Sequence, residues 1–174
     1  MPISYAVAFV IAASAFRLAT LAVSIRHESV LRKGGAVEHG RKNSSALAVA
    51  HLAYYTAAAI EGLRRAAAFD ATSATGLAVY LFGAIMLIVV IRSLGPLWTV
   101  KLIIARNHTL VTNPLFRAVR HPNYYLNIIP ELVGFALTLH AFATLIVGLP
   151  LYLIPLVLRI RQEERVMHDT FVGY

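Results

Sequence analysis

The sequence predicts an all-α integral membrane protein with about five transmembrane helices, on the basis of three observations. Apolar residues make up 59% of the 174 residues, whereas soluble domains have about 45–50%. Charged residues make up only 14%, against about 25% in soluble domains. Long apolar segments also alternate with short polar connections, and basic residues concentrate in every second connection.

The apolar segments have lengths close to the roughly 17–25 residues that a helix needs to cross a bilayer. They lie at about Ile3–Ile25, Ala46–Leu63, Thr75–Ile91, Tyr124–Leu139 and Ala141–Leu158. Only His140 separates the last two, so we expect a tight helical hairpin over residues 124–158, followed by a polar cytosolic tail. One membrane domain over 1–174 is expected, with three spans in 1–91 and the candidate functional motifs, the hairpin and the tail in 92–174.

The basic residues predict the orientation of these spans. If five helices cross, 13 of the 16 Lys and Arg residues lie on one side of the membrane. They are Arg26, Arg32, Lys33, Arg41, Lys42, Arg92, Lys101, Arg106, Arg117, Arg120, Arg159, Arg161 and Arg165. Because cytoplasmic loops are enriched in Lys and Arg, the N-terminus is expected outside and the C-terminus in the cytoplasm.

The composition also excludes several classes of protein. With no cysteine, the chain has neither disulfides nor thiolate metal sites, and we predict no metal site of another kind. The net charge of +8 could indicate nucleic acid, but no Lys/Arg-rich soluble region is large enough for such a module. We therefore expect membrane lipids, and not nucleic acid, as partners.

Residues 92–125 contain basic, aromatic and turn-forming residues without a clear period. Such a segment beside a membrane could surround a polar ligand, with Trp98 as a candidate contact to the substrate. It could equally be an interfacial segment anchored by Trp98 and Lys101. His121 and Pro122 directly precede the fourth apolar segment, where free helix N–H groups suit a carboxylate; the alternative is a simple helix cap.

Charged residues within or just after the apolar segments are further candidates. A carboxylate inside a membrane span is costly, so Glu131 is expected to face a substrate or a structural partner on another helix. His51 and Glu61 are weaker candidates of the same kind. Arg159 and Glu163 are four residues apart on one helix face, which indicates either a site or a solvated ion pair.

Three motifs together resemble the isoprenylcysteine carboxyl methyltransferase family over about residues 94–174. The first is His108-Thr109-Leu110-Val111, the second Arg120-His121-Pro122-Asn123-Tyr124, and the third the run from Arg159 to Glu163 and Glu164 after the hairpin. The resemblance is closest to small bacterial members, which implies a multi-pass protein of the bacterial inner membrane with its active site facing the cytoplasm.

The resemblance implies an S-adenosylmethionine-dependent methyltransferase with a cytosolic cofactor pocket. Its cofactor residues would be His108, Thr109, Leu110, Val111, His121, Pro122, Asn123, Tyr124 and Glu163. Arg159 would hold the methyl acceptor, which makes Arg159 and Glu163 the candidate catalytic pair. Lys101 stands where the family often has Gln, and Phe116 where Tyr is common, so the cofactor contacts of these two residues are expected to differ.

The sequence is compatible with more than one acceptor and more than one class of protein. The acceptor could be a prenylated cysteine carboxylate, which is already ionised, or the hydroxyl of an alkylpyrone or phenolic lipid, which must lose a proton. The alternatives to a methyltransferase are a related sterol- or phospholipid-modifying membrane enzyme, including NADPH-dependent reductases, and a non-enzymatic subunit of a small membrane transporter.

Overall fold

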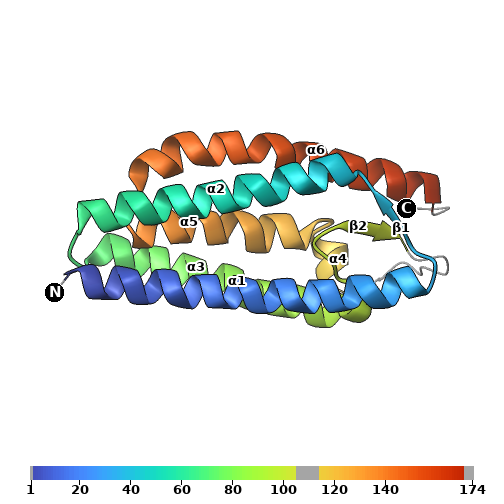
Figure 1. Cartoon of the computed structure of the whole chain (residues 1–174), viewed down its shortest axis with the longest axis horizontal. Coiled ribbons are helices and arrows are strands. Elements are labelled where there is room, and N and C mark those ends of the chain that lie inside the picture. The colour runs from blue at the N-terminus through green and yellow to red at the C-terminus, as the bar shows by residue number, and fades with distance from the viewer. Residues whose placement is uncertain (1, 105–113, 171–174) are drawn as a thin grey trace.

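The long helices of the protein lie roughly side by side in an elongated bundle (Figure 1). The structure, a computed structural model, describes residues 2–104 and 114–170, and side chains within 5–104 and 114–169. Its helices are α1 (Pro2–Lys33), α2 (Arg41–Arg65), α3 (Ala71–Leu94), α4 (Pro114–Ala118), α5 (Ile129–Thr138) and α6 (Leu149–Thr170). Short π-helical segments, Asn123–Ile128 and Thr144–Gly148, precede α5 and α6, and a 3-10 turn, Gly95–Leu97, follows α3.

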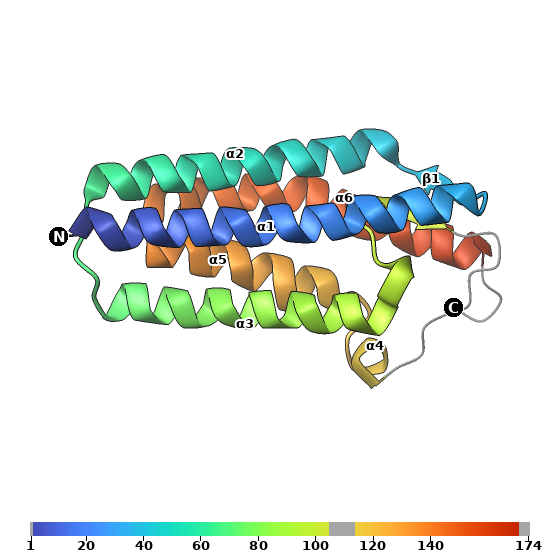
Figure 2. The same ribbon diagram turned by 60° about the horizontal axis from the view of Figure 1, so that its bottom comes forward.

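Two short strands, β1 (Val37–His39) and β2 (Leu102–Ile104), pair antiparallel at one end of the bundle. Glu38 lies opposite Ile103 in this pairing. The last turns of α1 and α6 and the short helix α4 lie at the same end, which we call the ribbon end (Figures 1 and 2). At the opposite end, the hairpin end, the chain reverses between α5 and α6 through His140, which has a positive φ of 56°.

Four helices within the described residues are long and apolar enough to cross a membrane: Tyr5–Lys33, Arg41–Arg65, Ala71–Leu97 and Thr144–Asp169. Large apolar side chains on them face outward, such as Leu52 with 69% of its surface exposed and Ile146 with 71%. In water this exposure would be unfavourable, whereas in lipid it is the expected arrangement. The protein is therefore an integral membrane protein.

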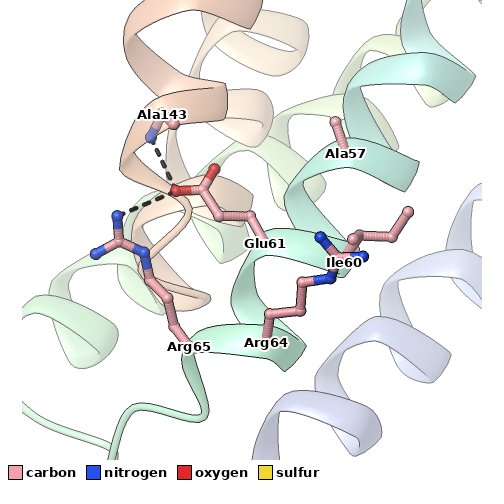
Figure 3. Close-up of a pocket in the computed structure, with 6 residues that line it drawn as sticks. All are labelled: Ala57, Ile60, Glu61, Arg64, Arg65 and Ala143. Carbon is pink, nitrogen blue, oxygen red and sulfur yellow. Dashed lines mark hydrogen bonds and ion pairs between the residues drawn. The ribbon is translucent and has the colours of Figure 1, made fainter.

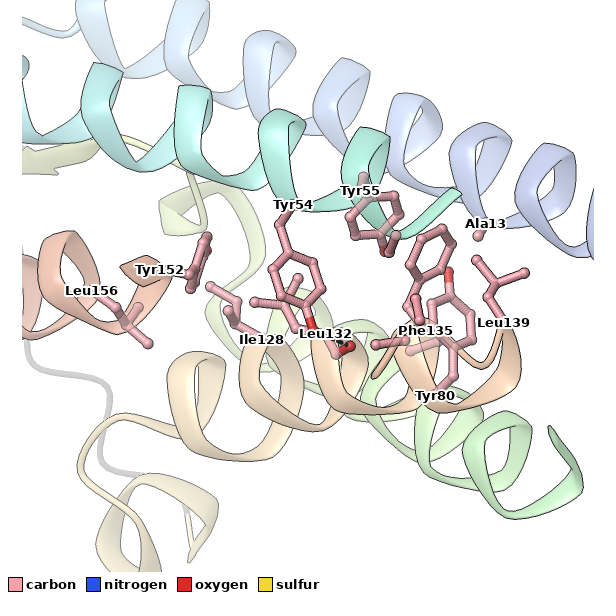
Figure 4. Close-up of a cluster of buried hydrophobic side chains, with 14 of the residues drawn as sticks. Ala13, Tyr54, Tyr55, Tyr80, Ile128, Leu132, Phe135, Leu139, Tyr152 and Leu156 are labelled. Carbon is pink, nitrogen blue, oxygen red and sulfur yellow. Dashed lines mark hydrogen bonds between the residues drawn. The ribbon is translucent and has the colours of Figure 1, made fainter. Parts of the chain in front are cut away.

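The fifth expected span, at 124–139, is the π-helical segment and α5, which together are shorter than the other four helices. This element is the most buried of the bundle: Leu132, Phe135 and Ala136 have no exposed surface. Phe135 stacks on Tyr55 of α2 at a ring-centroid distance of 4.1 Å (Figure 4). The helix thus lies in the interior of the bundle and packs most closely against α3.

Glycines allow α3 and α5 to approach each other closely. A Cβ atom at Gly134 would lie 2.3 Å from the Tyr80 backbone nitrogen, and one at Gly76 would lie 2.3 Å from the Thr138 nitrogen. Such small residues let helix backbones touch in membranes, where the hydrophobic effect contributes little to helix association.

We expect Gly134→Ala to destabilise the protein by about 1–3 kcal/mol, because the new methyl group collides with rigid backbone. Gly148→Ala is the matched control, since its Cβ would meet only side-chain atoms of Tyr54 and Thr144 at 3.2 Å or more. Unfolding in detergent, followed by circular dichroism, measures both variants. Equal stability losses would contradict the close α3–α5 contact.

Candidate functional site

Arg159 lies in α6 near the ribbon end and is buried, with only 3% of its surface exposed. All three guanidinium nitrogens donate hydrogen bonds: Nε to the Tyr124 hydroxyl at 3.2 Å, NH1 to Ser44 Oγ at 2.7 Å and NH2 to the Val100 carbonyl at 3.1 Å. Each of these partners is an uncharged group. A buried guanidinium with neutral partners favours the approach of an anion.

Tyr124 connects Arg159 to Glu163. Its hydroxyl accepts from Arg159 and donates to Glu163 Oε2 at 2.5 Å. Arg159 and Glu163 are one turn apart in α6, so both side chains point towards the same phenol. The three residues form a continuous chain of hydrogen bonds between an arginine and a carboxylate, and the side chain of Glu163 remains 29% exposed.

His121 joins the same cluster from the other side. Its Nε2 lies 2.6 Å from Glu164 Oε1, while its buried Nδ1 lies 3.6 Å from Glu163 Oε1 and has no hydrogen-bond partner among the described residues. Burial alone would lower the pKa of His121, but the two carboxylates outweigh burial and raise the pKa above its ordinary value of 6.5. The protonated imidazolium is therefore favoured in the folded protein.

This raised pKa predicts a pH dependence of stability. The contribution of protonated His121 is fully present below its unfolded pKa of about 6.5 and is lost as the pH rises through the higher folded pKa. We expect the wild-type melting temperature in detergent to fall as the pH rises above about 6.5, the unfolded pKa. His121→Gln should flatten that slope, and parallel wild-type and variant curves would contradict the pairing with Glu163 and Glu164.

Pro122 and Asn123 lead into the π-helical segment that contains Tyr124. Pro122 is buried and stands immediately before the π-helical segment, where its missing N–H costs nothing. A π-helical turn advances the chain by an extra residue per turn and is frequent at functional sites. The side-chain amides of Asn123 and Asn127, one helical turn apart, approach each other to 3.2 Å.

Three further predicted site residues that the structure describes are Lys101, Trp98 and Phe116. Lys101 binds Glu28 of α1, with Nζ and Oε1 2.7 Å apart. Trp98 is buried and packs against Leu87 and Val90 of α3. Phe116 lies half-buried in α4. The predicted residues His108, Thr109, Leu110 and Val111 fall outside the described residues.

Glu131 is fully buried two helical turns beyond Tyr124 and has a different set of partners. It forms an ion pair with Arg17 of α1 and accepts a hydrogen bond from the Tyr55 hydroxyl. With its amide turned so that nitrogen faces acceptors, Asn127 also donates to Glu131 Oε2 at 3.1 Å. These contacts satisfy a charge in the membrane interior and connect α1, α2 and α5.

Glu61, a carboxylate of α2, acts as a cap at the hairpin end. It accepts hydrogen bonds from the backbone nitrogens of Ala143 and Thr144, at 2.9 and 2.8 Å, and lies 3.4 Å from Arg65. A shallow surface depression surrounds it, lined by Ala57, Ile60, Glu61, Arg64, Arg65 and Ala143 (Figure 3). Unpaired helix N–H groups explain why an acidic residue lies here.

Sequence reasoning did not assign a role to Ser44, to the Val100 carbonyl or to Glu164. Glu164 stands beside Glu163 in the motif, so the sequence offered a signal for it. Ser44 lies at the start of α2, more than a hundred residues from Arg159, and nothing in its neighbourhood predicts the contact. The Val100 contact uses a backbone carbonyl, for which no side-chain pattern exists.

The helices and the buried charged cluster define an integral membrane protein with a polar site at one end of its bundle. The sequence model of the isoprenylcysteine carboxyl methyltransferase (ICMT) family matches residues 76–169, more than half of the chain. The chain belongs to this family. The matched region contains His121, Tyr124, Arg159 and Glu163.

Two bacterial relatives are similar over nearly their whole length. An uncharacterized protein of Haemophilus influenzae is 47% identical over 157 residues, which cover 90% of this chain and 91% of the relative. The uncharacterized protein YpbQ of Bacillus subtilis is 25% identical over 156 residues, which cover 90% of this chain and 92% of the relative. No solved structure matches the chain significantly.

Proposed function

We propose that the protein is an S-adenosylmethionine-dependent O-methyltransferase that acts on a lipid-like acceptor in the membrane. The main observation behind this proposal is the hydrogen-bonded chain from Arg159 through Tyr124 to Glu163. It provides a cationic group and an anionic group at one buried site, within the region matched by the family. In a methyl transfer from a sulfonium to an oxygen anion, one reactant is cationic and the other anionic, so a site with one group of each charge suits both reactants.

The residues at the site suit the cofactor. S-adenosylmethionine carries a methyl group on a cationic sulfur. An acceptor oxygen would attack the methyl carbon in line, forming a carbon–oxygen bond as the carbon–sulfur bond breaks and neutral S-adenosylhomocysteine leaves. Glu163, which is part-exposed, can attract that positive charge or the cofactor ammonium group. The buried Nδ1 of His121 has no hydrogen-bond partner among the described residues and lies 3.6 Å from Glu163 Oε1, so it can bind a further polar group of the cofactor.

The surroundings of Arg159 favour an acceptor that presents an ionised oxygen. Its described partners are two hydroxyls and a carbonyl, so no carboxylate contacts the guanidinium directly. A prenylated carboxylate and the deprotonated hydroxyl of a pyrone or phenolic lipid both meet this requirement. Positioning of the oxygen against the methyl group would then provide much of the rate.

We further propose that the site faces the cytoplasm of a bacterial inner membrane. Arg32, Lys33, Arg41 and Lys42 lie at the junction of α1 and α2 at the ribbon end, beside the cluster of Arg159 and Glu163. The positive-inside rule assigns such an end to the cytoplasm, where S-adenosylmethionine is made.

Titration of the purified protein in detergent tests the proposed function. S-adenosylhomocysteine and S-adenosylmethionine should bind in calorimetry, and NADPH should not. Incubation of the protein with a membrane lipid extract and methyl-labelled S-adenosylmethionine should then transfer label to an organic-soluble product. A folded preparation that binds neither sulfur compound would remove the methyltransferase proposal, and binding of NADPH would favour the reductase alternative.

A further inference from the structure

One face of α1 holds the segment of residues 98–101 through three side chains. Ser24, His27 and Glu28 are spaced three and four residues apart, so they lie on the same side of the helix. Ser24 Oγ accepts from the Val100 backbone nitrogen at 2.9 Å, and His27 Nδ1 donates to the Trp98 carbonyl at 2.9 Å. Glu28 binds Lys101, with Oε1 and Nζ 2.7 Å apart.

The segment of residues 98–101 in turn contacts Arg159. Val100 is bonded on both sides: its N–H donates to Ser24, and its carbonyl accepts from Arg159 NH2 at 3.1 Å. Thr99 Oγ1 donates to the Lys101 carbonyl at 2.7 Å, which fixes the turn around Val100 internally. One of the three described hydrogen bonds of the guanidinium is therefore connected to α1 through this short backbone segment.

The middle of α1 is fixed independently of these contacts. Arg17 forms its ion pair with the buried Glu131 of α5, about two helical turns from Ser24. This pair connects the middle of α1 to α5, and Ser24 and Glu28 meet the segment of residues 98–101 further along the same helix. The ion pair itself makes no described contact with Arg159.

We propose that Ser24 and Glu28 are positioning residues that fix the Arg159 guanidinium through Val100 and Lys101. This inference rests on the proposed function, because it assumes that Arg159 holds the acceptor. Neither residue lies in the region that the family model matches, which begins at residue 76. The inference assigns α1 a role in acceptor alignment, in addition to crossing the membrane.

Kinetics of Ser24→Ala test the inference. A neutral hydrogen bond contributes enough that its loss should lower kcat for acceptor methylation by about 2- to 10-fold. The KM for S-adenosylmethionine and the melting temperature should stay close to wild type, because the cofactor side of the site is untouched. Ser24→Thr keeps the hydroxyl and should restore kcat, and Ser29→Ala, an exposed serine on the same helix, should behave as wild type.

A second measurement does not depend on activity. Because the chain has no cysteine, Ser24→Cys combined with Val100→Cys allows a short thiol-reactive cross-linker to report whether α1 and residue 100 are in contact. Cross-linking together with the selective loss of kcat would support the inference. Absence of the cross-link would overturn it, as would an unchanged kcat or an equal loss of cofactor affinity in Ser24→Ala.

The two proposals fail in different ways. If wild-type protein binds no S-adenosylhomocysteine and transfers no methyl group, the proposed function is wrong whether or not the cross-link forms. If wild-type protein is active and Ser24→Ala is equally active, the function stands and only the positioning role is lost.

Discussion

Arg159→Lys is expected to lower kcat/KM for the acceptor at least tenfold, roughly the effect of losing one charged hydrogen bond. Lysine keeps the positive charge but replaces the planar fork by a single ammonium group. It cannot contact Ser44, Val100 and Tyr124 in the same geometry and still present nitrogen atoms to an acceptor oxygen. The measurement is the initial rate of methyl transfer at varied acceptor concentration.

The affinity for S-adenosylhomocysteine should change much less in this variant, by no more than about threefold. Arg161→Lys is the matched control, since Arg161 is exposed on another face of α6 and should keep wild-type kinetics. Loss of cofactor affinity in Arg159→Lys with unchanged acceptor kinetics would mean that Arg159 serves the cofactor and not the acceptor.

Hydropathy predicted most of the architecture because it follows from the membrane environment. The long apolar segments correspond to α1, α2, α3 and α6, and the predicted reversal near His140 is present. The span count was less predictable for the segment at 124–139. The interior of a membrane protein and the lipid tails around it are similarly apolar. Hydropathy therefore does not distinguish a helix that faces lipid from α5, which is buried among other helices.

The site was predictable only as far as neighbouring residues share a helix face. The Arg159–Glu163 spacing anticipates two side chains pointing the same way, and the structure adds Tyr124 between them. The contacts of Ser44 and Ser24 join distant elements, and a serine in an apolar helix has no distinctive pattern. Glu131 was an ambiguous candidate because a buried carboxylate needs a partner in either role, and its contact with Arg17 is a long-range one.

The prediction for Glu163 concerns the other half of the site. Glu163→Gln removes one negative charge and leaves the side-chain volume almost unchanged. If Glu163 binds a cationic group of the cofactor, affinity for S-adenosylmethionine should fall about 10- to 150-fold, because a charged hydrogen bond contributes about 1.5–3 kcal/mol. Calorimetric titration of the wild type and the variant in the same detergent measures this directly.

The charge dependence of this effect separates a cofactor role from a structural one. The amide oxygen that Glu163→Gln introduces can still accept the Tyr124 hydrogen bond, so the Tyr124–Arg159 contact should be retained. The melting temperature should fall only by what the charge of Glu163 contributes through protonated His121. Asp169→Asn makes the same charge change at an exposed position of α6 and should leave affinity unaltered. Equal affinities of wild type and Glu163→Gln would show that the carboxylate serves only to order Tyr124 and His121, in which case the cationic groups of the cofactor must be bound elsewhere.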